Sequence, residues 1–183
     1  MITTDTKKAT KWSADTTHSE IQFKVKHLMV TTVTGGFKHF ESEIESLDEN
    51  FTDAKITFSA DINSINTGSE DRDNHLKSPD FFESDKYPKL SFTSTSFKKV
   101  DGDEYELTGD LTIRDVTKPV KLKAEYAGRA KDPWGNVKAG FSLEGKINRK
   151  DFGLTWNAPL ETGGVLVSED VKLLAELQFV EKA

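Results

Sequence analysis

Apolar and polar residues alternate with a period of two along most of this chain. The alternation is clearest at 21–25, 54–62, 90–92, 105–113, 120–126, 141–147 and 171–179. Successive side chains of a strand point to opposite faces, so each run predicts a strand with one apolar face. With a Gly-rich stretch at 32–40, the pattern predicts about eight strands.

Strands with a single apolar face must bury it, either against a second sheet or inside a barrel. Glycines within strands favour the barrel, since they mark bends or close approaches of backbone. They occur at Gly35, Gly36, Gly109, Gly140 and Gly145. We therefore predict an all-β fold, an extended antiparallel barrel of about eight strands that is either filled by side chains or holds one small ligand, as in lipocalins.

An insertion at about 67–83 interrupts the alternation with many charges and two adjacent phenylalanines. Thr67 followed by Glu70 predicts a capping box, and Ser78 before Pro79 predicts a second helix start. We expect one or two short helices here. Such an insertion in a β protein either covers a cavity or carries catalytic residues.

Composition and charge exclude several classes of partner. The net charge is −6 and the pI is about 5.3. No nucleic-acid partner is expected, since neutralising phosphates requires a basic surface. No apolar run approaches the roughly 20 residues that span a bilayer, so the chain is not expected to be membrane-spanning. The chain has no Cys, which excludes disulfides and thiolate chemistry.

The first residues are polar and rich in Thr. Residues 1–11 are expected to be a flexible segment, with the barrel domain at 12–183. The start lacks the apolar core of a signal peptide. A cytoplasmic location is therefore expected, or a periplasmic one if a signal has been removed.

The charged cluster in the insertion is the best candidate for catalysis. On a helix His75 neighbours Asp71 and Arg72, and a carboxylate that orients a His provides a general base. The alternative is that Arg72 and the acids anchor the insertion to the barrel rim. No nucleophile motif accompanies the cluster, so no catalytic residue is predicted.

Other polar motifs are less specific. The four histidines lack the spacing of metal ligands, so no metal is expected. Arg149, Asp151 and Gly153 predict a turn in which Arg149 and Asp151 pair and the glycine bends the chain. From the residues alone, the inward apolar stripes fit a packed core and a cavity for an apolar chain equally well.

A series of motifs resembles the YceI-like family and keeps the family's order from about Trp12 to Val180. The motifs are Asp15-x-x-His18-Ser19-x-Ile21-x-Phe23, Thr34-Gly35-Gly36-Phe37, Ser64-Ile65-x-Thr67-Gly68, Arg72-Asp73-x-His75-Leu76-x-Ser78-x-Asp80-Phe81-Phe82, Tyr87-Pro88, Gly109-Asp110-Leu111-Thr112-Ile113, Val116-Thr117-x-Pro119-Val120 and Asn148-Arg149-x-Asp151-Phe152-Gly153. One departure is Arg114-Asp115, where the family commonly has a Gly before its Val-Thr.

The resemblance implies a lipocalin-like barrel with a helical insertion and a long internal cavity. The implied ligand is a polyisoprenoid or similar long-chain lipid, such as an isoprenoid quinone or a fatty-acid derivative. A carrier, store or sequestering protein is then expected rather than an enzyme, with no cofactor other than bound lipid, and a homodimer is compatible with it. Two alternatives stay open: an enzyme that uses Arg72, Asp73 and His75 on a lipid-like substrate, and a filled barrel that binds a partner on its outer surface.

Mapped onto the alternation, the resemblance predicts which residues contact the ligand. Those inside the barrel are Phe23, Val25, Ile56, Phe58, Ile62, Leu90, Phe92, Leu111, Ile113, Leu122, Phe141, Leu143 and Leu173. Those at the mouth are Leu76, Phe81, Phe82, Phe152 and Trp156. Arg72, His75 and Arg149 are expected to meet a polar head group.

Overall fold

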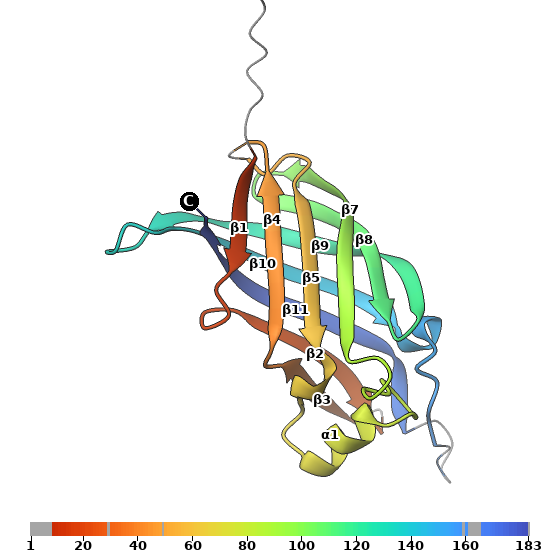
Figure 1. Cartoon of the computed structure of the whole chain (residues 1–183). Helices are drawn as coiled ribbons and strands as arrows, with labels where there is room; N and C mark the ends of the chain where they lie inside the picture. Colours follow the sequence, from red (N-terminus) through yellow and green to blue (C-terminus); the bar gives the residue numbers. More distant parts are fainter. Residues whose placement is uncertain (1–8, 29, 49, 159, 161–165, 183) are drawn as a thin grey trace, which may run out of the picture.

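Strands dominate the structure (Figure 1). The computed structural model describes residues 9–28, 30–48, 50–158, 160 and 166–182. The strands are β1 Thr10–Ala14, β2 Glu20–His27, β3 Thr31–Phe37, β4 Phe40–Ser46, β5 Lys55–Asp61, β6 Ile65–Asn66, β7 Lys89–Asp101, β8 Glu104–Ile113, β9 Val116–Lys131, β10 Val137–Asn148 and β11 Val167–Glu181. The helical elements are η1 Ile62–Ser64, α1 Glu70–Lys77 and η2 Arg149–Phe152.

The segment expected to be flexible, residues 1–11, includes the start of β1. Residues 1–8 of the segment expected to be flexible lie outside the described residues, as does residue 183. β1 begins at Thr10, so two residues of that segment already pair with β4.

The strands close into an eight-stranded antiparallel barrel, which confirms the predicted fold. The hydrogen-bonded order is β1-β4-β5-β7-β8-β9-β10-β11. β11 then returns to β1, with Trp12 opposite Glu181 and Ala14 opposite Phe179. Closure leaves no open sheet edge around this ring, which is why one apolar face per strand suffices.

At two positions around the barrel wall, two consecutive short strands take the place of one long strand. β1 and β2 both pair with β11, and β4 and β3 pair with β1 and β2 in turn. The Asp15 carboxylate stabilises the turn that separates β1 from β2. It accepts hydrogen bonds from the backbone N and Oγ1 of Thr17 and lies 2.9 Å from His18 Nδ1. These breaks explain why there are more strand segments than predicted strands.

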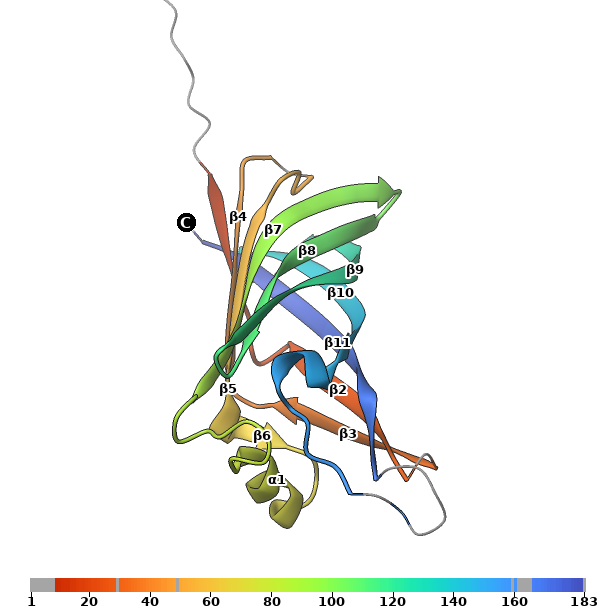
Figure 2. The same ribbon diagram turned by 90° about the vertical axis from the view of Figure 1, so that its right-hand side faces the viewer.

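A loop seals one end of the barrel. β5 and β7 pair only from Thr57 to Asp61 of β5, and beyond that the hairpin of β7 and β8 bends away (Figure 2). Phe51, from the loop between β4 and β5, fills the gap and is fully buried. Its ring lies 5.2 Å from that of Phe141 and 5.5 Å from that of Trp12. This aromatic cluster closes the barrel at the end where the chain terminates.

The helical insertion lies at the opposite end (Figures 1 and 2). It contains one α-helix, α1, whose N-cap is Ser69 rather than the predicted Thr67. The Thr67 hydroxyl instead donates to Asp73 at 2.6 Å and accepts from Arg72 Nε at 2.8 Å. The second predicted helix is wrong: Ser78 is the C-cap of α1, its hydroxyl donating to the His75 carbonyl, and a turn follows.

Candidate ligand-binding cavity

The barrel encloses an apolar cavity of about 600 Å³. This volume falls within the roughly 300–1,000 Å³ of typical ligand sites. Inward-facing side chains on its wall are only half-buried although they point away from bulk solvent; examples are Phe58, Leu122, Leu143 and Leu173. Their exposed area faces the cavity. The barrel is therefore not filled by its own side chains, and the filled-barrel alternative loses its premise.

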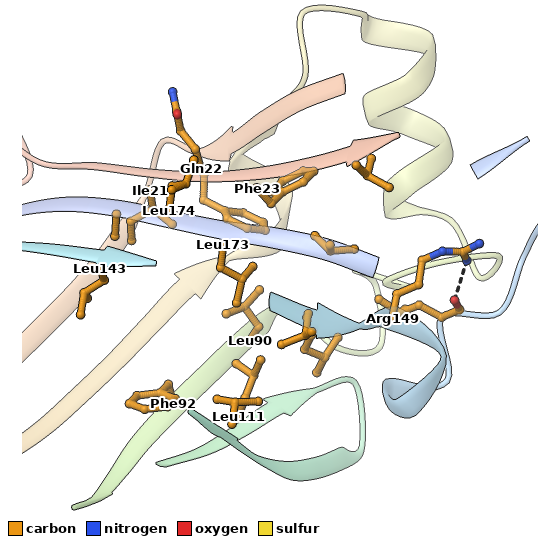
Figure 3. Close-up of a pocket in the computed structure, with 18 of the residues that line it drawn as sticks. Ile21, Gln22, Phe23, Leu90, Phe92, Leu111, Leu143, Arg149, Leu173 and Leu174 are labelled. Carbon is orange, nitrogen blue, oxygen red and sulfur yellow. Dashed lines mark hydrogen bonds between the residues drawn. The ribbon is translucent and has the colours of Figure 1, made fainter. Parts of the chain in front are cut away.

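Strand register aims these side chains at one another. Leu173 of β11 lies opposite Phe23 of β2, and Leu143 of β10 lies opposite Ala124 of β9. Figure 3 shows Leu143, Leu173 and Leu90 directed into the same space, whereas Gln22 points away from it. The alternation read from the sequence thus assigns the inner face correctly on these strands.

Most of the residues predicted to contact a ligand line the cavity. They are Phe23, Val25, Ile56, Phe58, Arg72, His75, Leu76, Phe81, Phe82, Leu90, Phe92, Leu111, Ile113, Leu122, Phe141, Leu143, Arg149, Trp156 and Leu173. Their contact with a ligand stays a prediction.

Ile62 and Phe152 differ from the prediction, because both are 1% exposed and lie in the packed core. Ile62 follows the end of β5 and belongs to η1, so strand alternation no longer sets its direction. Phe152 belongs to η2, which packs against β9, β10 and β11. The β9–β10 ladder ends at Lys123 and Glu144, and η2 follows β10 and packs where that pairing has ended.

The prediction missed several lining residues. Phe37 and Ile44 line the cavity from β3 and β4. Alternation within each strand gives these positions, but the bend at 38–39 shifts the phase between the two strands. Phe97 also lines it, although its odd separation from Phe92 predicts the opposite face. A β-bulge between Ser94 and Ser96 shifts the register and turns Phe97 inward. No feature of the single sequence reveals that bulge.

An aromatic cluster from two segments lies at the mouth. The His75 ring is 4.6 Å from that of Trp156 and 5.1 Å from that of Phe81, both nearly perpendicular to it. His75 Nε2 lies 2.9 Å from Asp80 Oδ2. α1 is thereby joined to the segment after η2 mainly through rings with apolar faces.

The charges of α1 mainly hold the helix in place. Asp73 Oδ1 accepts from the backbone N of Thr67 at 2.8 Å, in addition to the hydroxyl. Arg72 donates from Nε to Thr67 Oγ1 at 2.8 Å and from Nη2 to the Thr67 carbonyl at 2.6 Å. Arg72, Asp73 and His75 therefore do not converge on one reactive point. The anchoring alternative accounts for these contacts.

Arg149 does not pair with Asp151, contrary to the prediction. It is 3% exposed and donates to four backbone carbonyls, those of Leu154, Trp156, Val167 and Ser168. Burial lowers the pKa of its guanidinium from the ordinary value, with Glu169 opposing the shift. Because arginine stays charged, the result is a buried cation beside the cavity (Figure 3). Gly153 does bend the chain, with φ of 79°.

Metal and membrane-spanning motifs are not found in the described parts of the chain. No group of three or more His, Asp or Glu side chains there is placed to hold a metal ion. Likewise, none of the helices that the structure describes combines the length and apolar composition needed to cross a bilayer.

Comparison with known proteins agrees with this geometry. The model of the YceI-like domain matches residues 12–179. The chain belongs to the YceI-like domain family. A UPF0312 protein of Pectobacterium atrosepticum is 39% identical over 172 residues, which cover 94% of this chain and 86% of that protein.

Solved structures share the YceI-like barrel. The Campylobacter jejuni YceI protein is 37% identical and has a TM-score of 0.74, over 86% of this chain and 90% of that chain. A polyisoprenoid-binding domain from Saccharophagus degradans, implicated in plant cell wall breakdown, has a TM-score of 0.63 at 15% identity, over 93% of this chain and 98% of that chain. That second likeness shows the fold.

Proposed function

We propose that this YceI-like barrel binds one polyisoprenoid or similar long-chain amphiphile, with the chain in the cavity and the head group at the mouth. The unfilled apolar cavity carries this proposal. It is sealed at the Phe51 end, where Phe51 is fully buried, and at the α1 end the charged side chains of Asp71 and Arg72 line it. Burial of an apolar chain contributes roughly 25 cal/mol per Å², so a long chain supplies most of the affinity.

The distribution of polar groups supports an amphiphile over a plain hydrocarbon. At the mouth Arg72 is exposed and keeps N–H donors beyond the two that it gives to Thr67. Lys26 also lines this end. The polyisoprenoid-binding domain of Saccharophagus degradans supports the same class of ligand through its shared fold.

A carrier, store or sequestering role follows from this binding mode, and we favour it over enzymatic turnover. Arg72 and Asp73 are engaged with Thr67, and His75 with Asp80. A His75→Ala variant tests the enzyme alternative. Under our proposal, neither the wild type nor the variant converts a bound lipid into another compound. A turnover by the wild type that His75→Ala removes would contradict the proposal.

Equilibrium titration tests binding directly. The probes are a dansyl-labelled polyprenol and an anthroyloxy-labelled fatty acid, read by fluorescence. Leu143→Trp places a ring in the cavity and should weaken binding of the preferred probe by about tenfold or more. Lys123→Trp, on the exposed outer face of neighbouring β9, is the matched control and should bind normally. Absence of saturable binding of either probe to the wild type would overturn the proposal.

A further inference from the structure

An exposed apolar tip stands beside the mouth of the cavity. The hairpin of β2 and β3 ends at the same end of the barrel as α1 (Figure 2). At its tip Leu28 is 41% exposed and Val30 is 77% exposed. The backbone N of Leu28 donates to the carbonyl of Leu166 at 2.8 Å, and Leu166 lines the cavity. The tip is therefore held next to a segment of the cavity wall.

Turn chemistry does not explain the leucine. Leu28 has φ of 56°, in the left-handed region that favours Gly and Asn. An exposed Leu there is unfavourable for the fold and contributes little buried surface in return. Backbone outliers of this kind concentrate at functional sites. Among the described non-glycine residues with positive φ, Leu28 is the one that is both apolar and exposed, which fits contact with a partner.

Lysines line the outer face of the same part of the wall. Lys146, Lys172 and Lys24 lie directly opposite one another across β10, β11 and β2. Lys146 has an ion pair with Asp170 at 3.2 Å, but within the described parts of the chain Lys24 and Lys172 have none. Like charges directly opposite are destabilising in a sheet. An external anion would offset this repulsion.

Charged side chains of both signs surround the rim. On the α1 side, Glu70 and Asp71 are exposed and acidic. On the β2 side, Lys24 and Lys26 precede Leu28 by four and two residues. The lysines of the β2–β3 side therefore offer contacts for an anionic surface, whereas Glu70 and Asp71 do not.

We propose that the β2–β3 hairpin docks the cavity mouth on an anionic lipid bilayer. Leu28 and Val30 enter the head-group region, and Lys24 and Lys172 contact anionic head groups. This inference rests on the proposed lipid-binding function. Docking lets an apolar chain pass between bilayer and cavity without crossing water, where each exposed methylene raises the barrier.

Transfer kinetics test the docking. Protein loaded with the anthroyloxy-labelled fatty acid is mixed with vesicles of phosphatidylcholine, with or without phosphatidylglycerol, that contain a quencher. Direct collision predicts a transfer rate that rises with vesicle concentration and is faster with phosphatidylglycerol. Leu28→Asn with Val30→Asn should slow transfer about tenfold and leave a rate independent of vesicle concentration. Leu47→Asn with Val100→Asn, 61% and 60% exposed at the sealed end, should transfer like wild type.

A second set of variants in the same transfer experiment tests the lysines. Lys24→Gln with Lys172→Gln should abolish the acceleration by phosphatidylglycerol, whereas Lys99→Gln with Lys131→Gln should retain it. Equilibrium affinity for the probe, measured without vesicles, should be unchanged in every pair. A wild-type rate independent of vesicle concentration, or equal slowing by both apolar pairs, would overturn the docking. Failure of the proposed function is distinguishable, because the probe would then not bind at all.

Discussion

The guanidinium Nη1 of Arg149 lies 2.8 Å from the backbone carbonyl oxygen of Trp156, whose side-chain ring lies at the cavity mouth. The same side chain donates to the carbonyl of Leu154 at 2.6 Å and to that of Ser168 at 2.8 Å. One buried cation thus ties the segment after η2 to the start of β11. The mouth is held by backbone hydrogen bonds to this side chain, which leaves its apolar surface available to a ligand.

Replacing Arg149 should destabilise the protein. Arg149→Met keeps the apolar stem but leaves buried carbonyls unsatisfied, at about 1–3 kcal/mol for the first of them, so we expect the free energy of unfolding to fall by about 3 kcal/mol. Arg149→Lys should recover part of the loss. Urea unfolding measures both. Lys150→Met, which removes an exposed ion pair with Glu169, should cost under about 1 kcal/mol, and an equal loss there would contradict the role of Arg149.

Phe51→Ala should open the sealed end of the barrel. The ring is fully buried against Trp12 and Phe141, so we expect the free energy of unfolding to fall by about 4 kcal/mol. The variant should also accept longer chains. Titration with dansyl-labelled polyprenols of increasing length measures this. Leu47→Ala, on the exposed part of the same loop, should change neither quantity. An unaltered length profile in a folded Phe51→Ala protein would show that another feature limits the chain.

The barrel could be predicted because its cause is repeated in every strand. Phe23, Leu143 and Leu173 face inward through plain alternation, and register then brings them together. Phe97 could not be placed this way, since the bulge before it reverses its face. Phe51 was also missed, because a loop residue carries no periodicity that would reveal its burial.

Polar assignments were less predictable because several partners compete for each group. Thr67 is a plausible N-cap by sequence, yet Asp73 and Arg72 engage its hydroxyl and Ser69 caps α1. Arg149 has Asp151 two residues away, but a buried guanidinium gains more from several carbonyls fixed around it. Such outcomes depend on the assembled tertiary structure rather than on local spacing.

Gly35→Ala should reduce the cavity. A Cβ at Gly35 would lie 2.4 Å from Cζ of Phe23, the residue opposite it in the β2–β3 ladder. The ring must then move into the cavity, and we expect weaker binding of the polyprenol probe with a loss of about 1–3 kcal/mol in stability. Gly140→Ala meets its nearest neighbour at 3.3 Å and serves as the control. Equal affinities in the two variants would contradict this role of Phe23.

Asp15 should make stability depend on pH in the acid range. Hydrogen bonds from Thr17, then His18 and Lys138, hold the pKa of its carboxyl well below the ordinary 3.8. The ionised form is thus favoured in the folded state. Its contribution, about 2 kcal/mol, is complete well above pH 3.8 and is lost as the pH falls below that value toward the folded-state pKa.

The measurement is denaturant unfolding of wild type and Asp15→Asn at a series of pH values. Their difference in the free energy of unfolding should be constant near neutral pH and shrink as the pH falls below about 4. Thr17→Val should show part of the same effect. A difference that does not change with pH would contradict the role of the carboxylate charge.

Mass spectrometry of the lipid extracted from protein purified without detergent tests the central claim most directly. We expect one long-chain isoprenoid or acyl compound in stoichiometric amount in the wild type and in Lys123→Trp, and strongly reduced occupancy in Leu143→Trp. Wild-type protein that carries no such compound and also binds neither fluorescent probe would contradict the account.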